Sequence, residues 1–316
     1  MVPEPTFTIV MAAYNACSTI ENAVQSVLNQ TRRDFELVVV DDGSTDDTAR
    51  RVDGFRLDTR VRLIRQHNRG LPAARNVAIA AGRGRYVTIL DSDDLLMPTY
   101  LESIGRALDR TPGAGIAFAD AWRLDDRSGR FWRHTVMIAR GAPRPVPTGA
   151  TTLLEALVRS NFVPIMFTVR RSALERVGNF REEKPELAED WELLLRLAAF
   201  GYPATVVPSV LGIYRRNVPG SFTIDRDRML RLSRETLRVF LAEHPAPEEV
   251  KAVARRRIRQ FEAQLESAGG WKRHPVVQAA RERFSGAASL IRRDPLRRRL
   301  PREIALAFPN LARSHR

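Results

Sequence analysis

Residues 36–46 read ELVVVDDGSTD and residues 86–94 read YVTILDSDD. Each stretch is a short apolar run, rich in β-branched residues, that ends in a group of aspartates. Apolar runs without polar alternation are typical of strands buried on both faces, and such strands occur in parallel sheets that helices cover. Ligands of these sheets bind beyond the carboxyl ends of the strands. The two stretches therefore predict an α/β fold with its chemistry at one rim.

The same alternation of strands and helices continues outward from these stretches. We expect a capping box, formed by Ser18 and Glu21, to begin the first helix. Strands are expected at residues 7–12, 36–40, 61–64, 86–90, 115–120 and 165–169, and helices from residue 18 and at 45–52, 71–80, 151–159, 188–200, 226–242 and 247–267. The expected fold is a Rossmann-like, mostly parallel sheet flanked by helices, with a helical C-terminal extension.

Acidic side chains follow two of the predicted strands. Asp41 and Asp42 follow the second strand, and Asp91, Asp93 and Asp94 follow the fourth. Three carboxylates in four residues repel one another unless a cation or hydrogen-bond donors lie between them. Mg²⁺ and Mn²⁺ prefer oxygen ligands of this kind. A solvated turn that caps the next helix is the alternative, but two acidic groups on neighbouring strand ends favour a metal and ligand site.

Four motifs resemble those of the family 2 glycosyltransferases, which have the GT-A fold. They are Ala13-Tyr14-Asn15 at the first strand end, VVVDDGSTD at 38–46, NRGLPAARN at 68–76 and LDSDD at 90–94. Their order and spacing are those of the family. A further motif, EDWEL at 189–193, matches the acidic pair with which a helix of the family begins, and the resemblance extends to about residue 221.

The resemblance implies an inverting, non-processive transferase of the bacterial type. Such an enzyme moves a sugar from a nucleotide-diphosphate donor, with UDP-sugars favoured, to a hydroxyl of a glycan or lipid-linked acceptor in cell-surface glycan or glycoconjugate assembly. It further implies that Asp190 is the catalytic base and that Asp93 binds Mn²⁺ or Mg²⁺, with Asp91 in contact through water. The residues implied to bind the nucleotide-sugar are Ala13, Tyr14, Asn15, Asp41, Asp42, Gly70, Arg75, Asp91, Ser92 and Asp93.

Glu189, Trp191 and Arg215 are expected to support this site. Core packing is the expected role of the Trp191 ring, with stacking on a sugar as the alternative. Arg215 lies in YRRN at 214–217, which resembles a Tyr-Arg-x-His stretch of the family with Asn217 in place of the histidine. Its guanidinium is expected either to neutralise the charge of a diphosphate or to form a surface salt bridge.

Other interpretations stay open. The sequence lacks the Gln-x-x-Arg-Trp motif and the membrane helices of processive synthases, which favours single additions of sugar. A retaining GT-A transferase and a non-catalytic module that binds nucleotide-sugars or membranes are the alternatives. A nucleotidyltransferase is disfavoured because the sequence has no glycine-rich phosphate loop.

The positive charge concentrates toward the C-terminal end of the chain. The formal net charge is +14, and residues 222–316 contain 22 Lys plus Arg against 11 Asp plus Glu. Residues 290–300 interleave arginines with apolar residues, a basic amphipathic pattern that is typical of contact with an anionic membrane, with a solvated surface as the alternative. No nucleic-acid-binding motif accompanies the arginines, so we expect no nucleic-acid partner.

The expected organisation has two parts. Residues 1–221 form the GT-A glycosyltransferase domain, with a nucleotide-binding half at about 1–120 and an acceptor half at about 121–221. Residues 222–316 form a helical, arginine-rich region. The single cysteine, Cys17, excludes an intrachain disulfide. The sequence has no signal-peptide pattern and no long apolar stretch, and it therefore predicts a cytoplasmic protein. Peripheral contact with the inner face of the membrane stays open.

Overall fold

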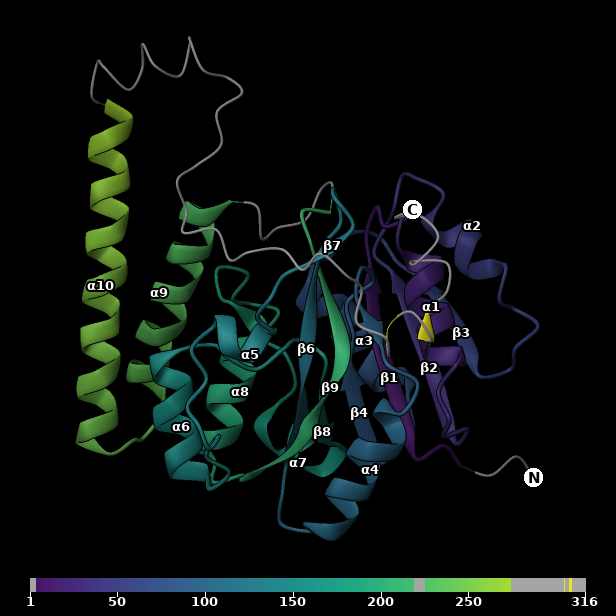
Figure 1. Cartoon of the computed structure of the whole chain (residues 1–316), viewed down its shortest axis with the longest axis horizontal. Coiled ribbons are helices and arrows are strands. Elements are labelled where there is room, and N and C mark those ends of the chain that lie inside the picture. Colours follow the sequence, from purple (N-terminus) through teal and green to yellow (C-terminus); the bar gives the residue numbers. More distant parts are fainter. Residues whose placement is uncertain (1–3, 219–224, 274–303, 305–306, 309–316) are drawn as a thin grey trace.

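The computed structural model describes residues 4–218, 225–273, 304, 307 and 308 of the chain (Figure 1). These residues form one mixed sheet with helices around it. The strands are β1 (Phe7–Ala13), β2 (Phe35–Asp41), β3 (Val61–Arg65), β4 (Tyr86–Ile89), β5 (Leu95–Leu96), β6 (Ile116–Asp125), β7 (Arg130–Phe131), β8 (Phe167–Arg170) and β9 (Ala204–Arg216). The helices are α1 (Ile20–Leu28), α2 (Thr48–Asp53), α3 (Leu71–Ala81), α4 (Tyr100–Arg110), α5 (Val136–Ala139), α6 (Ala150–Arg159), α7 (Arg171–Val177), α8 (Glu189–Ala199), α9 (Arg226–Glu243) and α10 (Glu248–Arg273).

The sheet has the strand order β3-β2-β1-β4-β8-β6-β9-β5, with β7 paired to β6. The strands β3, β2, β1 and β4 are parallel to one another. β8 is antiparallel to both of its neighbours, β4 and β6, and β5 is antiparallel to β9. The predicted α/β fold with a mostly parallel sheet is therefore confirmed in the N-terminal half, and the reversal at β8 makes the whole sheet mixed.

The N-terminal strands form because both of their faces are covered. Every residue of β1 is buried, as is every residue of β2 except Glu36. α3 packs against β1 and β2. Burial on both faces removes the polar alternation that a half-exposed strand would show, which is the pattern present in the sequence.

The capping box predicted at Ser18 is wrong. α1 begins at Ile20, and Thr19, which precedes it, makes no side-chain hydrogen bond to the helix N-terminus. The residues before the helix are held by the neighbouring loop, because the backbone N–H of Cys17 donates to Asp46 Oδ2 at 3.1 Å.

α2 begins later than predicted for a related reason. The sequence predicted its start at Thr45, and the helix begins at Thr48. The backbone N–H of Thr45 donates to Asn15 Oδ1 at 2.9 Å, and Thr48 Oγ1 accepts from the backbone N–H of Ala16 at 2.8 Å. These contacts hold residues 45–47 outside the helix and tie the β2 loop to the β1 loop.

The helical C-terminal region that the sequence predicted is present. α9 and α10 contact each other, α9 packs on α8, and α10 packs on α6. Figure 1 shows the pair on one side of the molecule, beside α6 and α8 and away from β3 and α2. Within the described ranges, the length and apolar character that a membrane-crossing helix needs occur together in none of the helices.

The last described residues pack on the sheet. Ile304 is fully buried, and Ala307 and Phe308 lie beside it in an apolar cluster separate from the main core. The other buried members of this cluster are Leu95, Met97, Trp122, Leu124, Phe131 and Ile213. Because β5 begins directly after Asp94, the cluster adjoins the acidic group at 91–94. The arginine pattern at 290–300, from which membrane contact was predicted, lies outside the described residues.

Candidate active site at the strand ends

The ends of β1, β2 and β4 meet at one edge of the sheet. Ala13 is the last residue of β1 and lies opposite Asp41, the last residue of β2. Ile89, at the end of β4, lies opposite Val10 of β1. The side chains that follow these strands therefore share one rim, as expected for parallel strands. Tyr14 is 50% exposed at this rim and presents an aromatic ring to solvent.

Asn15 joins two of the rim loops. Its φ of 50° lies in the left-handed region, which asparagine tolerates better than most residues. Its Oδ1 accepts from the N–H of Thr45 at 2.9 Å, and its own N–H donates to Ser44 Oγ at 2.9 Å. These bonds give Asn15 the role of holding the β2 loop in place. Contact between Asn15 and a nucleotide stays a prediction.

The neighbouring aspartates Asp41 and Asp42 have different surroundings. Asp42 is buried and accepts three hydrogen bonds: from Gln66 Nε2 at 2.7 Å and from the backbone N–H groups of Arg69 and Gly70 at 2.9 Å each. Both of its oxygens are therefore engaged in holding the loop that leads into α3. Gly70 lies at the start of that helix with a φ of +89°, a conformation that favours glycine.

Asp41 keeps an oxygen available for a ligand. Its Oδ1 accepts from the N–H of Ser44 at 3.3 Å, and its Oδ2 has no hydrogen-bond partner within the described part of the chain. The carboxylate is buried at the strand end, so a ligand donor there would meet an acceptor that water reaches poorly. Of the two aspartates, Asp41 is the better placed to bind a nucleoside.

Asp91, Asp93 and Asp94 form the acidic cluster. One carboxylate oxygen from each lies within 4.8 Å of the others. Asp94 is fully buried; its Oδ1 accepts from the backbone N–H of Arg215 at 2.8 Å, and its Oδ2 has no partner among the described residues. A buried, unpartnered oxygen beside two further carboxylates fits a hard divalent cation with oxygen ligands. Ser92, part-exposed, lies within the same turn.

The protonation of this cluster agrees with such a cation. Burial and, after it, the charge of Asp91 raise the pKa of the Asp93 carboxyl to about 7. Burial also raises the pKa of Asp94 above its ordinary value, together with the charges of Asp93 and Asp91. Closely spaced carboxyl groups with raised pKa values retain protons, and a metal ion that binds them displaces these protons.

Arg75 connects the acidic cluster to α8. Its buried guanidinium donates from Nη2 to Asp91 Oδ1 at 2.7 Å and from Nη1 to Glu189 Oε1 at 2.8 Å. Its Cζ lies 5.1 Å from the centre of the Phe180 ring. Burial raises the pKa of Glu189 although the Arg75 charge opposes that shift. The sequence predicted that Arg75 binds the nucleotide-sugar. In the structure, both terminal nitrogens of its guanidinium bind carboxylates of the protein.

Asp190 lies next to Glu189 in the first turn of α8. Its Oδ1 accepts from the backbone N–H of Trp191 at 2.7 Å, and its Oδ2 accepts from Asn161 Nδ2 at 3.3 Å. Trp191 is buried and donates from Nε1 to the carbonyl of Leu157 at 2.9 Å. The indole therefore belongs to the core, as expected, and stacking of this ring on a sugar is excluded.

Arg215 is buried rather than on the surface. Its Nε donates to Asp126 Oδ1 at 2.9 Å, and its Nη1 has no partner among the described residues. Of the two expected roles, the surface salt bridge is therefore wrong in its location, because Arg215 pairs with Asp126 as a buried side chain of β9. Asn217, in the place of the family's histidine, donates to Asp125 Oδ1 at 2.7 Å and fastens the end of β9 to β6.

Sequence reasoning missed Asn161, Asp126 and Arg140. Asn161 binds Asp190 from 29 residues away, and Asp126 binds Arg215 from 89 residues away. The Arg140 Nη1 donates to the carbonyls of Asn161 and Val163 at 3.3 and 3.1 Å. All three lie in loops or at element ends without a periodic pattern, and no local signal in the sequence marks them.

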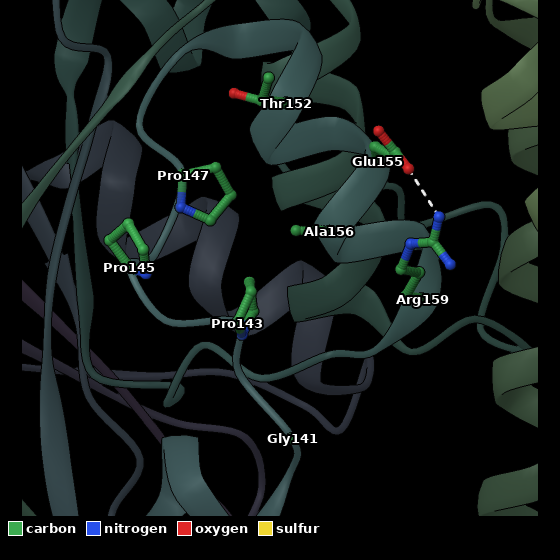
Figure 2. Close-up of a pocket in the computed structure, with 8 residues that line it drawn as sticks. All are labelled: Gly141, Pro143, Pro145, Pro147, Thr152, Glu155, Ala156 and Arg159. Carbon is green, nitrogen blue, oxygen red and sulfur yellow. Dashed lines mark hydrogen bonds and ion pairs between the residues drawn. The ribbon is translucent and has the colours of Figure 1, made fainter.

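A pocket of about 300 Å³ lies elsewhere, between the proline-rich loop and α6 (Figure 2). Its walls are Gly141, Pro143, Pro145, Pro147, Thr152, Glu155, Ala156 and Arg159. The one carboxylate in this lining, Glu155, pairs with Arg159 at 2.6 Å. The pocket has apolar walls and no group of carboxylates, so the acidic rim is the better candidate for the reacting site.

A model of the Glycosyl transferase family 2 matches residues 8–178. The succinoglycan biosynthesis protein ExoO of Rhizobium meliloti (strain 1021) is 36% identical over 215 residues, which are 66% of this chain and 60% of that protein. The chondroitin synthase of Escherichia coli is 44% identical over 198 residues, 62% of this chain and 27% of that protein. The chain thus spans less than two thirds of the length of either relative.

Two solved structures share the fold. TarS 1-349 of S. aureus, in complex with UDP-GlcNAc, has a TM-score of 0.62 at 19% identity, with 81% of this chain and 71% of that chain covered. The mannosyltransferase PcManGT from Pyrobaculum calidifontis, in complex with GDP-Man and Mn²⁺, has a TM-score of 0.55 at 21% identity, with 99% and 81% covered. At these identities the likeness establishes the GT-A fold.

Proposed function

Because the chain belongs to glycosyl transferase family 2 and is a glycosyltransferase, we propose that it transfers a sugar with inversion from a nucleotide-diphosphate donor to an acceptor hydroxyl. The favoured donor is a UDP-sugar, and the acceptor is a glycan or a lipid-linked glycan of the cell surface. The observation that carries the proposal is the Arg75 fork, which joins Asp91 of the acidic cluster to Glu189, the neighbour of Asp190. It brings a donor site and a base into one centre.

On the donor side, Asp41 and the Tyr14 ring form the part of the rim that receives the nucleoside. Asp42 and Asn15 do not contact the nucleoside in this proposal; they hold in place the loops that form this part of the rim. Asp91, Asp93 and Asp94 are the residues that would hold Mn²⁺ or Mg²⁺. When bound, such an ion would supply positive charge against the leaving nucleoside diphosphate. The backbone N–H of Arg215 fixes Asp94, and the Arg215 guanidinium, which pairs with Asp126, keeps its Nη1 without a partner among the described residues.

On the acceptor side, Asp190 is the proposed base. Its carboxylate takes the proton of the acceptor hydroxyl while the hydroxyl oxygen forms a bond to the anomeric carbon. The bond between that carbon and the diphosphate oxygen breaks, and its electron pair leaves with the nucleoside diphosphate. A single displacement of this kind inverts the anomeric configuration and needs no covalent sugar intermediate.

The test compares three single variants of the full chain. UDP-, GDP- and dTDP-sugars are screened for transfer to a panel of nitrophenyl glycosides with Mn²⁺ or Mg²⁺, and for thermal stabilisation of the protein. We expect Asp190→Asn to lower transfer by about 10²–10⁴-fold while keeping donor binding. We expect Asp93→Asn to lose the metal-dependent stabilisation by the donor. Asp47→Asn, which removes an exposed partner of Arg50 on α2, is the matched control and should behave as wild type.

The outcomes separate the alternatives. Wild-type transfer by Asp190→Asn would remove the proposed base, and metal-dependent donor binding by Asp93→Asn would remove the proposed metal site. Proton NMR of the first product gives its anomeric configuration, and retention would establish a retaining enzyme. Donor binding by the wild type without turnover on any acceptor of the panel would favour a binding module.

We also propose that residues 1–221 form the catalytic domain. The chain works in the cytoplasm, and residues 222–316 bring it into peripheral contact with an anionic membrane. The support is the excess of arginine in that region. Co-sedimentation with anionic and neutral vesicles, for the whole chain at two salt concentrations, tests the contact. Equal binding to both vesicle types would exclude it.

A further inference from the structure

Asn161 lies in the loop between α6 and β8 and carries an amide with one fixed partner. Its Nδ2 donates to Asp190 Oδ2 at 3.3 Å. Its Oδ1 is buried and has no hydrogen-bond partner among the residues that the structure describes. Among the described residues, only the donor side of this amide therefore has a hydrogen-bond partner. A polar group buried with an unsatisfied atom is unfavourable for stability, so its position needs another explanation.

The backbone of Asn161 is held firmly. Arg140 Nη1 donates to the carbonyls of Asn161 and Val163 at 3.3 and 3.1 Å. Ser160 Oγ donates to the carbonyl of Arg140 at 2.6 Å. Phe162 and Val163, which follow directly, are buried in the core. The amide of Asn161 is thus mounted on a rigid loop, and rigid mounting is what a functional side chain needs to keep another group in position.

The orientation of the amide follows from charge. A carboxylate offers only acceptor atoms, so the N–H side of the amide must face Asp190 and the oxygen must face away. The other Asp190 oxygen is held by the N–H of Trp191 at 2.7 Å. The two donors therefore fix the plane of the carboxylate from two elements, the N-terminus of α8 and the 160–166 loop.

We propose that Asn161 is a positioning residue that orients Asp190 toward the acceptor hydroxyl. The proposal rests on the proposed role of Asp190 as the base. With one donor on each oxygen, the carboxylate cannot rotate freely, and a lone pair stays directed at the proton that it removes. Loss of the Asn161 donor frees that rotation, and small errors in the placement of a reacting group cost large factors in rate.

The arrangement also links the two sides of the centre. The Arg140 guanidinium that holds the loop has its Cζ 5.3 Å from the centre of the Tyr214 ring, on β9. Arg215, the next residue, donates its backbone N–H to Asp94 of the acidic cluster. The loop that orients the base is thus fastened to the strand that fixes the acidic cluster.

The test measures kcat, acceptor KM and UDP–Mn²⁺ stabilisation of full-length variants, with the donor and acceptor found in the screen above. We expect Asn161→Ala to lower kcat by about 10- to 100-fold. Asn161→Asp, which keeps the shape but replaces the donor by a like charge, should lower kcat further at pH 8. Stabilisation by UDP and Mn²⁺ should be unchanged in both. The matched control Arg159→Ala removes an exposed ion pair with Glu155 at the end of α6, directly before the same loop, and it should keep kcat.

A double variant decides whether Asn161 acts through Asp190. We expect Asn161→Ala to cause no further loss of kcat when it is added to Asp190→Asn, since the carboxylate that it orients is gone. Additive losses, wild-type kcat in Asn161→Asp, or an equal loss in Arg159→Ala would each overturn the proposal. Wild-type kcat in Asp190→Asn alone would show instead that the role of Asp190 as the base is the part that fails.

Discussion

At the scale of single residues, neighbours in the sequence have separate tasks. Asp41 and Asp42 carry the same chemistry and follow the same strand, yet Asp42 binds three donors of the 66–70 loop and Asp41 one donor of its own loop. The sequence motif marks both as nucleotide ligands because it records residue type. Only the path of the chain after β3 determines which carboxylate is already occupied.

This difference predicts opposite effects for two matched variants. Asp42→Ala leaves two buried backbone N–H groups and one amide without their charged acceptor, so we expect the free energy of unfolding to fall by about 2–3 kcal/mol. Asp41→Ala should cost less stability, because it removes one hydrogen bond, but should weaken UDP binding more. Urea unfolding and a UDP titration with Mn²⁺ measure the two quantities. The assignment is contradicted if Asp41→Ala is the less stable protein and Asp42→Ala the weaker binder per folded molecule.

At the scale of elements, α8 carries the site at its first turn and is fastened at its middle. Arg196 pairs with Glu192 within the helix at 2.8 Å. Arg181 pairs with the same Glu192 at 3.1 Å and also binds Glu243 at the end of α9. This chain of buried and half-buried charges joins the C-terminal helices to the helix that holds Glu189 and Asp190. Among the described residues, α9 is therefore linked to the helix that carries the site.

The pKa of Glu243 makes this link testable by pH. Hydrogen bonds from Lys184 and Arg181 lower the pKa of Glu243 to about 2. A carboxyl whose pKa is lower in the folded than in the unfolded state contributes stability above its unfolded pKa, and the contribution is lost as the pH falls through the folded value. We expect wild type to be more stable than Glu243→Gln at pH 7, and the difference to shrink between about pH 4.5 and pH 2.

Thermal unfolding across that pH range measures the difference. Because the Glu243 side chain is partly exposed, salt should reduce it. Glu249→Gln, on the first turn of α10, is the control and should track wild type at every pH. A difference between wild type and Glu243→Gln that stays constant down to pH 2 would contradict the link.

The elements show how far a sequence alone predicts this fold. The predicted strands and helices lie where the pattern placed them, within a few residues, whereas β5, β7, β9, α4, α5 and α7 were not predicted. The direction of β8 was not predictable, because a strand buried on both faces reads the same in either direction. Thr168 of β8 shares a hydrogen bond with Thr88 of β4 at 2.8 Å, a contact across 80 residues. The predicted start of α1 was also wrong, and the turn before this helix is held by a tertiary contact in which Asp46 accepts from the backbone N–H of Cys17.

The candidate site divides along the same line. Asp91, Asp93 and Asp190 lie in motifs that local sequence carries, and Arg75 joins Asp91 to Glu189, the neighbour of Asp190. Asn161 and Asp126 reach that centre from loops with no motif, and the partner of each is distant in sequence. Recognition of a family predicts the groups that touch the substrate, whereas the groups that hold them depend on tertiary contacts of the individual chain.

At the scale of the whole molecule, distant parts of the chain converge on the acidic rim. Arg75 of α3 reaches α8, and the described C-terminal residues reach β5 and β9 on the other side of the acidic cluster. These contacts tie the described C-terminal residues to the proposed catalytic domain of residues 1–221, because Ile304 is as buried as any core residue. Two members of its cluster lie close to the site in the sequence: Leu95 directly follows Asp94, and Ile213 lies two residues before Arg215.

Ile304 therefore offers a test of the molecule as one unit. Its side chain fills the cluster of Leu95, Trp122 and Ile213, and removal of most of a buried isoleucine side chain destabilises a protein by about 2–5 kcal/mol when the cavity cannot collapse. We expect Ile304→Ala to lower the melting temperature and also to weaken the stabilisation by Mn²⁺ and UDP, because looser packing at Leu95 lets the Asp91–Asp94 turn move. Leu57→Ala, at a side chain that is 89% exposed, is the matched control and should change neither quantity. If Ile304→Ala unfolds at the wild-type temperature, the segment around Ile304 does not pack on the sheet. If the variant melts earlier but keeps the wild-type stabilisation by Mn²⁺ and UDP, this packing supports the fold alone, and Arg215 is enough to hold the acidic turn.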